Sequence, residues 1–141
     1  MKSIAQLLAH KPAVITVAPQ DSVRQALEVL ARHNIGAVPV TDGERLVGIF
    51  SERDYARKVA LKGLASTSTS VQEVMSTQVR CASLEDTVMG CMDLMTQKHI
   101  RHLPVLDNKK LLGILSIGDL VKAVIEDQQF QIKQLEEYIR A

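Results

Sequence analysis

A serine and an aspartate recur with the same spacing at two places in the chain, each time behind a glycine and two apolar residues. The segments are residues 48–54, GIFSERD, and residues 113–119, GILSIGD. A serine hydroxyl can donate to a phosphate, and an ionised carboxylate, which only accepts hydrogen bonds, suits the vicinal hydroxyls of a ribose. At a helix N-terminus, free backbone N–H groups and the helix dipole also favour an anion. The pattern therefore indicates a site for a ribonucleotide.

The same spacing has a simpler interpretation that needs no ligand. A serine at the N-cap of a helix, with an acidic residue three positions later, is an ordinary capping arrangement. Ser51 and Asp54 return as Ser116 and Asp119 in the second segment, which is compatible with either role. Both interpretations stay open at this point.

The two segments belong to a longer duplication. Residues 35–59 and 100–124 align without a gap at an offset of 65, and ten of the twenty-five positions are identical. Repeats of about 60 residues are only marginally stable alone, so the two halves are expected to share a core. We therefore predict a pseudo-twofold pair, and a cleft between such halves is a natural place for a ligand.

Hydrophobic spacing, caps and turn residues predict the elements that position the two segments. Helices are expected at residues 4–9, from a cap at Asp21 or Ser22 to Asn34, and at 52–60, 71–75 and 86–98. Strands are expected at residues 14–17, 37–41, 45–50, 79–82, 102–106 and 110–115. The fold class is therefore α/β of the α+β type, with two βαββα repeats and additional N-terminal and C-terminal helices. Residues 63–70, GLASTSTS, are the expected linker.

A last helix is predicted from Ser116 to the end of the chain, with no proline and no glycine after Gly118. Its apolar members are Leu120, Val124, Phe130, Ile132, Leu135 and Ile139. An apolar stripe of this kind needs a partner, which is either the N-terminal helix of the same chain or a second chain.

Composition excludes several classes of function. Aromatic residues make up 3% of the 141 residues and the formal net charge is +1, so neither a stacking platform for single strands nor a basic duplex-binding surface is present. No apolar run reaches the length of a membrane span. Cys81 and Cys91 form no CxxC pair and are expected to be reduced thiols of a cytoplasmic protein. We thus expect no nucleic-acid or membrane partner.

Catalysis and metal binding have little support in the sequence. The four histidines show no metal-ligand spacing, and no residue set offers a nucleophile, a base and an oxyanion stabiliser together. We therefore predict no metal site and no enzyme, which leaves only a slow nucleotide hydrolase open.

The repeated segments resemble a tandem of cystathionine-β-synthase-type (CBS) domains. The resemblance rests on AVPV and HLPV, on LVGIFSERD and LLGILSIGD, and on the duplication itself, and it covers about residues 10–126. It implies two repeats packed sheet against sheet, at 10–62 and 71–126, followed by a C-terminal helical extension at 127–141. It also implies two clefts for adenosine-bearing ligands such as AMP, ADP, ATP, S-adenosylmethionine or the nicotinamide dinucleotide NAD.

The same resemblance implies roles for individual residues. Asp54 and Asp119 would bind the two ribose diols, with Ser51 and Ser116 close to ribose or phosphate. Arg53 would pair with phosphate, whereas Gly118 stands at the matching position, so the two sites should differ.

Further contacts are implied at other positions. Arg101 and His102 would supply phosphate contacts where the first repeat has Gly36 and Ala37. The adenine would lie near Ala13 and Ile15 at the Asp119 site, and near Gln78 and Arg80 at the Asp54 site.

As a function, the resemblance implies a non-catalytic regulatory module. Such modules pair into homodimers, bind an adenine nucleotide and signal its occupancy to a client protein, which the sequence does not name. The alternative is a purely structural dimerisation module, in which the serines and aspartates are caps alone and the C-terminal helix recruits a client.

Overall fold

The protein is described by a computed structural model that covers residues 1–140. Ala141, the last residue of the predicted C-terminal extension, lies outside the described residues. The chain forms two compact units. Unit 1 contains Met1–Pro12, Cys81–Leu106 and the residues from Gly113 onward, and unit 2 contains Ala13–Arg80 and Asp107–Leu112.

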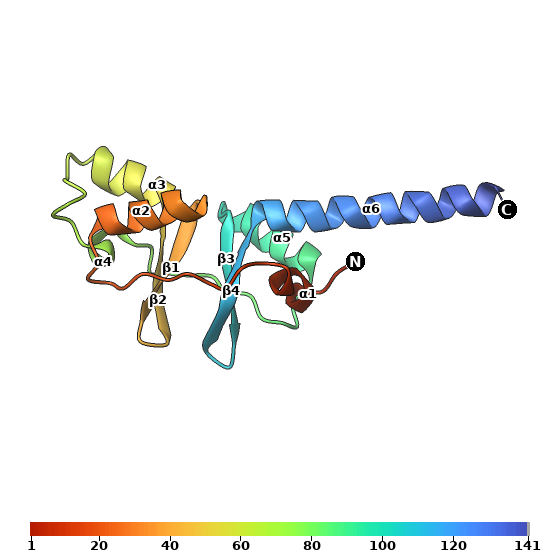
Figure 1. Ribbon diagram of the computed structural model, residues 1–141, viewed down its shortest axis with the longest axis horizontal. Helices are drawn as coiled ribbons and strands as arrows, with labels where there is room; N and C mark the ends of the chain where they lie inside the picture. The colour runs from red at the N-terminus through yellow and green to blue at the C-terminus, as the bar shows by residue number, and fades with distance from the viewer. Residues whose placement is uncertain (141) are drawn as a thin grey trace. The chain divides into compact units, whose positions relative to one another are not determined.

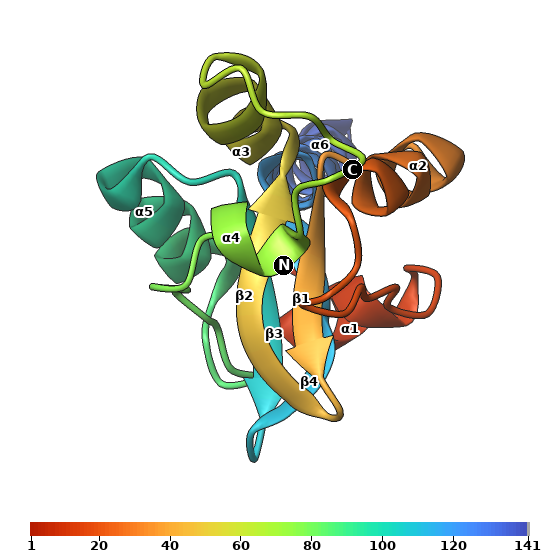
Figure 2. The same cartoon turned by 90° about the vertical axis from the view of Figure 1, so that its left-hand side faces the viewer.

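Unit 2 is built around an antiparallel hairpin. Strands β1 (Ala37–Asp42) and β2 (Arg45–Ser51) pair with each other. Helix α2 (Val23–His33) and helix α3 (Glu52–Asp54) lie at the open end of this hairpin (Figure 2). A π-helical segment, η1 (Tyr55–Ala60), follows α3 directly, and α4 (Val71–Val74) comes later in the chain.

The core of unit 2 consists of small aliphatic side chains and one aromatic ring. Ala26 and Leu30 lie on the buried face of α2, and Val38 and Val40 contribute from β1. Phe50 of β2 completes this cluster and is fully buried. The spacing of Ala26 and Leu30 is that of one helix face.

Unit 1 is also built from helices and an antiparallel hairpin (Figure 1). Its helices are α1 (Ile4–Ala9), α5 (Val88–Lys98) and α6 (Ile117–Arg140). Strands β3 (His102–Asp107) and β4 (Lys110–Ser116) belong to it except for the hairpin tip, Asp107–Leu112, which is part of unit 2. The side chains of Ile4, Met95, Leu103, Leu115 and Leu120 are fully buried in it.

Local capping chemistry explains where the helices begin and end. Ser3 caps α1 and Ser22 caps α2, and in each case a glutamine three residues on completes a capping box. Asn34 ends α2 and His99 ends α5 in the left-handed conformation, with φ of 52° and 54°. The N-cap of α2 is therefore Ser22, one of the two predicted residues.

The strands predicted at residues 14–17 and 79–82 are wrong in extent, because each is only a single parallel bridge. Val17 pairs with Val40, and its N–H donates to the carbonyl of Pro39 at 3.1 Å. If the parallel pairing continued to Ile15, the backbone N–H of residue 39 would have to donate to the carbonyl of Ile15. Residue 39 is proline, which has no N–H. The bridge of Ala82 to Val105 stops in the same way beside Pro104.

The helix predicted at residues 52–60 has the right limits but not one uniform geometry. Its second part is π-helical, and the N–H of Leu61 bonds the carbonyl of Ala56, five residues back, at 3.0 Å. Short π-helical segments occur frequently at functional sites.

The low-complexity stretch at residues 63–70 is hydrogen-bonded to the start of α2. The carbonyl of Thr69 accepts from the N–H of Val23 at 2.8 Å, and the carbonyl of Ser66 accepts from that of Arg24 at 2.9 Å. Thr69 is buried, and its hydroxyl donates to the carbonyl of Ala65. These residues thus satisfy free N–H groups of the first turn of α2.

Within residues 1–140, no helix combines the length and the apolar character that crossing a bilayer requires.

Candidate functional site

The first Ser-x-x-Asp segment folds into a reciprocal cap at the start of α3. The backbone N–H of Ser51 donates to Oδ2 of Asp54 at 2.9 Å, and its hydroxyl donates to the same oxygen at 3.0 Å. In return the backbone N–H of Asp54 donates to Oγ of Ser51 at 3.1 Å. The capping interpretation of these residues is therefore realised in the structure.

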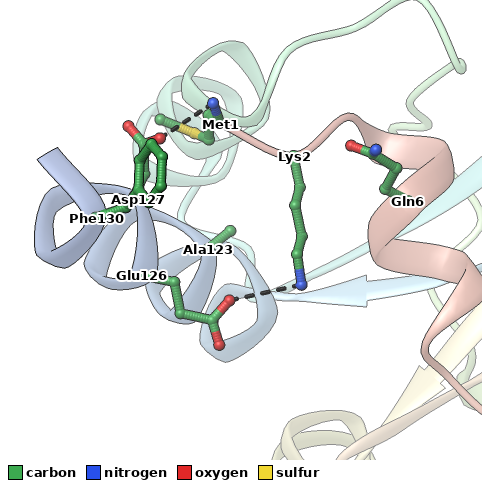
Figure 3. A pocket seen from close by; sticks show the side chains of 7 residues that line it. All are labelled: Met1, Lys2, Gln6, Ala123, Glu126, Asp127 and Phe130. Carbon is green, nitrogen blue, oxygen red and sulfur yellow. Dashed lines mark ion pairs between the residues drawn. The ribbon is translucent and has the colours of Figure 1, made fainter. Parts of the chain in front are cut away.

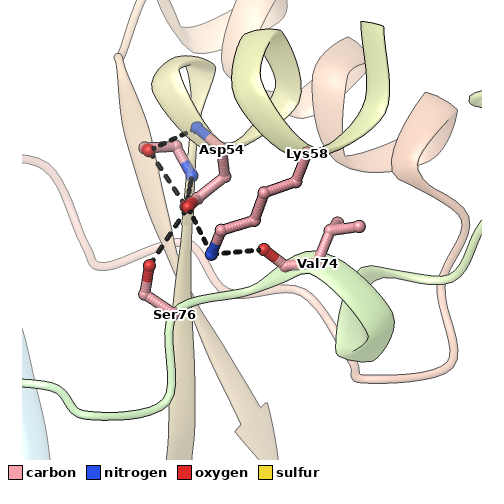
Figure 4. Close-up of polar contacts among 5 residues, drawn as sticks. Asp54, Lys58, Val74 and Ser76 are labelled. Carbon is pink, nitrogen blue, oxygen red and sulfur yellow. Dashed lines mark hydrogen bonds and ion pairs between the residues drawn. The ribbon is translucent and has the colours of Figure 1, made fainter. Parts of the chain in front are cut away.

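The second carboxylate oxygen of Asp54, Oδ1, contacts Lys58 in η1 and Ser76 in the segment after α4 (Figure 4). Oδ1 of Asp54 lies 3.0 Å from Nζ of Lys58 and accepts from the hydroxyl of Ser76 at 3.1 Å. Lys58 also donates to the carbonyl of Val74 at 3.1 Å. The Asp54 side chain is only 8% exposed, so this carboxylate is buried with both oxygens partnered, as a buried charge requires.

The second segment repeats the cap at the start of α6. The backbone N–H of Ser116 donates to Oδ2 of Asp119 at 2.8 Å, and the N–H of Asp119 donates to Oγ of Ser116 at 3.1 Å. The cation here comes from the N-terminal segment, because Nζ of Lys11 lies 2.6 Å from Oδ2 of Asp119. Lys11 also donates to the carbonyl of Ile114 at 2.8 Å.

The environment of Asp119 lowers its pKa. Burial acts in the opposite direction and is the largest single influence on the pKa of this carboxyl group. The hydrogen bonds from Lys11 and Ser116 and the charge of Lys11 together outweigh it. Asp119 is consequently an ionised acceptor at neutral pH.

The backbone before each hairpin lies against the corresponding cap. The carbonyl of Gly36 accepts from the N–H of Glu52 at 3.0 Å, and the carbonyl of Arg101 accepts from that of Ile117 at 2.9 Å. These two hydrogen bonds occupy equivalent positions in the repeats. Ala37 pairs directly with Ser51 in the hairpin.

The structure therefore brings several of the predicted residues together. Gly36, Ala37, Ser51 and Asp54 form one cluster in unit 2. Arg101, Ser116 and Asp119 form the equivalent cluster in unit 1, and His102 follows Arg101 as the first residue of β3.

The structure places the remaining predicted residues by their exposure and by their unit. Arg53 and Gly118 both occupy exposed positions in the first helical turn. Arg80 and Gln78 lie in unit 2 with Asp54, on the segment that follows Ser76.

Ala13 and Ile15 belong to unit 2, whereas Asp119 belongs to unit 1. The adenine contact expected there stays a prediction.

Three residues of the two clusters are absent from the sequence prediction. Lys58 is four residues after Asp54, and oppositely charged residues at this spacing in a helix predict an ion pair. Lys11 and Ser76 carry no such signal, since they lie 108 and 22 residues from the aspartates that they contact.

Each cluster pairs a carboxylate with an ammonium group. A carboxylate accepts hydrogen bonds from hydroxyl groups, and an ammonium group donates charge-assisted hydrogen bonds to anions such as phosphate. Among residues 1–140, no group of three or more histidine, cysteine or acidic side chains is arranged to hold a metal ion.

Comparison with known proteins gives the family context of this geometry. The family model described as CBS domain matches residues 4–61 and 71–126. A structure of a CBS-domain protein from Burkholderia ambifaria MC40-6 superimposes with a TM-score of 0.86 and 46% identity, over 90% of this chain and 96% of that one.

Two further similarities bear on function. The mitochondrial protein CBSX3 of Arabidopsis thaliana is 39% identical over 125 residues, which are 85% of this chain but only 61% of the relative. The CBS domain pair of protein MJ0100, crystallised in complex with 5'-methylthioadenosine and S-adenosyl-L-methionine, is 25% identical with a TM-score of 0.78, over 90% of this chain and 98% of that one.

Proposed function

The chain belongs to the CBS-domain family, and from this premise we propose that it binds an adenosine-containing nucleotide at each Ser-x-x-Asp cluster. CBS pairs are regulatory modules, and the related MJ0100 pair holds adenosine derivatives. AMP, ATP, NAD and S-adenosylmethionine are the ligands that we consider. The protein would then report nucleotide occupancy to a client protein.

The observation that carries the proposal is the lysine on each aspartate. Lys58 lies 3.0 Å from Asp54 and Lys11 lies 2.6 Å from Asp119. A ribose diol can donate two hydrogen bonds to a carboxylate, and the released ammonium group can bind the phosphate with a charge-assisted hydrogen bond. Each cluster thus contains both the acceptor and the cation that a nucleotide needs.

The two clusters differ in how readily this exchange can occur. The side chain of Asp119 is 29% exposed and its cation is 30% exposed, whereas Asp54 is 8% exposed and also accepts from Ser76. A partly exposed ion pair contributes little to stability, so its rearrangement costs little. We therefore propose the Asp119 cluster as the tighter of the two nucleotide sites.

Signalling would follow from population shift. A ligand stabilises whichever conformation it binds more tightly, by no more than its difference in affinity between the two. Lys11 and Asp119 both belong to unit 1, and the release of Lys11 from Asp119 on binding would be one physical change that a client can sense.

Titration calorimetry with AMP, ATP, NAD and S-adenosylmethionine tests the proposal. We expect Asp119→Asn to remove the tighter site and Asp54→Asn the weaker one. Asp93→Asn on the exposed face of α5 is the matched control and should bind like the unchanged chain. Full stoichiometry in the double variant Asp54→Asn/Asp119→Asn would show that the ribose assignment is wrong.

A second candidate is favoured by the reciprocal caps. Both aspartates already accept hydrogen bonds from the backbone N–H groups of Ser51 and Ser116. In a purely structural interaction module, these capping hydrogen bonds would be the whole role of the two aspartates. A thermal-shift series separates the two functions, since a ligand that binds only the folded chain raises the melting temperature with its concentration. An unchanged melting temperature with all four nucleotides would favour the structural module.

A further inference from the structure

The last helix carries a regular seam of exposed apolar residues. Counted from Val121, the positions follow spacings of four, three, four, three and four residues: Val121, Ile125, Gln128, Ile132, Leu135 and Ile139. This is the heptad pattern of a coiled-coil seam. Among its members, Ile132 is 55% exposed, Leu135 61% and Ile139 79%.

The N-terminal segment of the chain packs on a different face of α6 (Figure 3). The amino group of Met1 lies 3.0 Å from Oδ1 of Asp127, and Nζ of Lys2 lies 3.6 Å from Oε2 of Glu126. The pocket between these segments is also lined by Ala123 and Phe130.

The geometry of α6 places this face opposite the seam. Ala123 and Ile132 are nine residues apart, which is two and a half turns of an α-helix. Ala123 is buried, while Ile132 is exposed. The N-terminal helix is therefore not the partner of the seam. Leu120, Val124 and Phe130, which were predicted to belong to one apolar stripe with Ile132, lie outside the seam.

We propose that α6 forms a parallel two-stranded coiled coil with α6 of a second copy of this chain. Isoleucine occupies the a positions 125, 132 and 139, and the d positions 121, 128 and 135 hold valine, glutamine and leucine. β-Branched residues at a combined with leucine at d favour two parallel strands. This inference is independent of nucleotide binding.

Gln128 supports the parallel orientation. It is the one polar residue of the seam, at a d position. In a parallel, in-register dimer it faces its own copy, and the two amides can bond each other. In an antiparallel pair an a residue, which is isoleucine throughout, would face it, and the buried amide would lose its partners.

The flanking residues are compatible with the same arrangement. In a parallel pair, the g position 131 faces the e position 136 of the partner, which places Gln131 beside Glu136 without like-charge repulsion. Two heptads are short for a free helix. Here α6 is anchored at its start by the buried side chains of Leu120 and Ala123, so the seam is presented in a helix that is already formed.

Sedimentation equilibrium of the full chain tests the interface. We expect a dimer whose dissociation constant rises by about a hundredfold in Ile132→Glu, because two carboxylates would face each other in one buried layer. Phe130→Glu introduces the same charge on the opposite face and should remain dimeric. A monomeric unchanged chain, or an Ile132→Glu variant that dimerises normally, would overturn the proposal.

Disulfide trapping tests the orientation. Leu135→Cys should form a covalent dimer under mild oxidation, because d residues face each other in a parallel pair, whereas Gln134→Cys points outward and should not. The unchanged chain measures any background from Cys81 and Cys91. A Leu135→Cys variant that dimerises but does not cross-link would rule out the parallel register.

Nucleotide titration of Ile132→Glu separates this inference from the proposed function. The variant should bind nucleotide as the unchanged chain does. If Ile132→Glu loses the dimer but still binds nucleotide, the result supports the coiled coil. This conclusion does not depend on whether Asp54 and Asp119 bind ribose.

Discussion

The ammonium nitrogen of Lys11 lies 2.6 Å from Oδ2 of Asp119, although 108 residues separate the two in the chain. Lys11 also donates to the carbonyl of Ile114 in β4. The segment that precedes unit 2 thus completes the cluster at the start of α6. The ammonium group is the internal partner of the carboxylate, and at the proposed nucleotide site we expect it to bind a phosphate instead.

Lys11→Met tests this dual role. We expect AMP and ATP to bind about tenfold more weakly, since one charge-assisted phosphate contact is lost. Binding of 5'-methylthioadenosine, which has no phosphate, should not weaken. Folding stability should fall by only about 0.5 kcal/mol, because the ion pair is partly exposed. Calorimetry with AMP, ATP and 5'-methylthioadenosine measures the change in affinity for each ligand. The control is Lys2→Met, because the partner of Lys2 is Glu126. Equal losses for both ligands would contradict the phosphate role.

The lowered pKa of Asp119 predicts a specific pH dependence of stability. A carboxyl group whose pKa is lower in the folded than in the unfolded chain stabilises the fold above the unfolded pKa, and this contribution disappears as the pH falls through the folded pKa. We expect Asp119→Asn to be less stable than the unchanged chain near neutral pH and to approach it below about pH 4. Urea unfolding at both pH values measures this. A difference that does not change with pH would show that the charge of Asp119 is not responsible.

Gly48→Ala should disturb the first cluster through the backbone. A Cβ at this position would lie 2.6 Å from Sδ of Met75 and 2.9 Å from the carbonyl oxygen of Ser76. We expect a loss of about 1–3 kcal/mol in the free energy of unfolding. Because Ser76 donates to Asp54, binding at that cluster should weaken as well.

Gly113→Ala is the matched control in the second repeat. Its Cβ would meet only the end of the Leu8 side chain, at 2.9 Å, which can move. Denaturant unfolding of both variants should therefore show the larger loss at Gly48. The reverse order would show that the contact with Ser76 does not restrict β2.

Gly118→Arg should make the two clusters more alike. A Cβ at Gly118 would lie at an ordinary contact distance of 3.6 Å from Oγ of Ser116, and arginine occupies the equivalent position 53. We expect ATP to bind about fivefold more tightly at the Asp119 cluster. Gly118→Gln gains the same helix propensity without the charge and should leave the affinity unchanged. Calorimetry compares the two, and equal affinities would mean that this position does not face phosphate.

Elements that depend on neighbouring residues were predicted from the sequence with few errors. The helix predicted at 4–9 and the hairpins predicted at 37–50 and 102–115 are present, because caps, turns and alternating strands are local patterns. The strands at 14–17 and 79–82 were overestimated, since a pattern of apolar residues does not show that Pro39 and Pro104 interrupt the ladder on the other side.

The apolar stripe of α6 was recognised but its face was not. Leu120 and Phe130 satisfy a helical spacing as well as Ile132 does, so the sequence alone does not separate residues that pack inward from those that stay exposed. The structure makes this distinction. Leu120 is buried, Phe130 lines a pocket with the N-terminal segment, and Ile132 is exposed.

By itself the sequence determined the duplication and the two Ser-x-x-Asp caps, because each cap joins residues three positions apart and needs only a helix start to form. The tertiary structure decided which groups face the two carboxylates. Lys11 and Ser76 reach Asp119 and Asp54 from distant segments, and their positions depend on how the chain folds back on itself. Contacts of that kind follow from the packing of the whole unit, which no local spacing of residue types records.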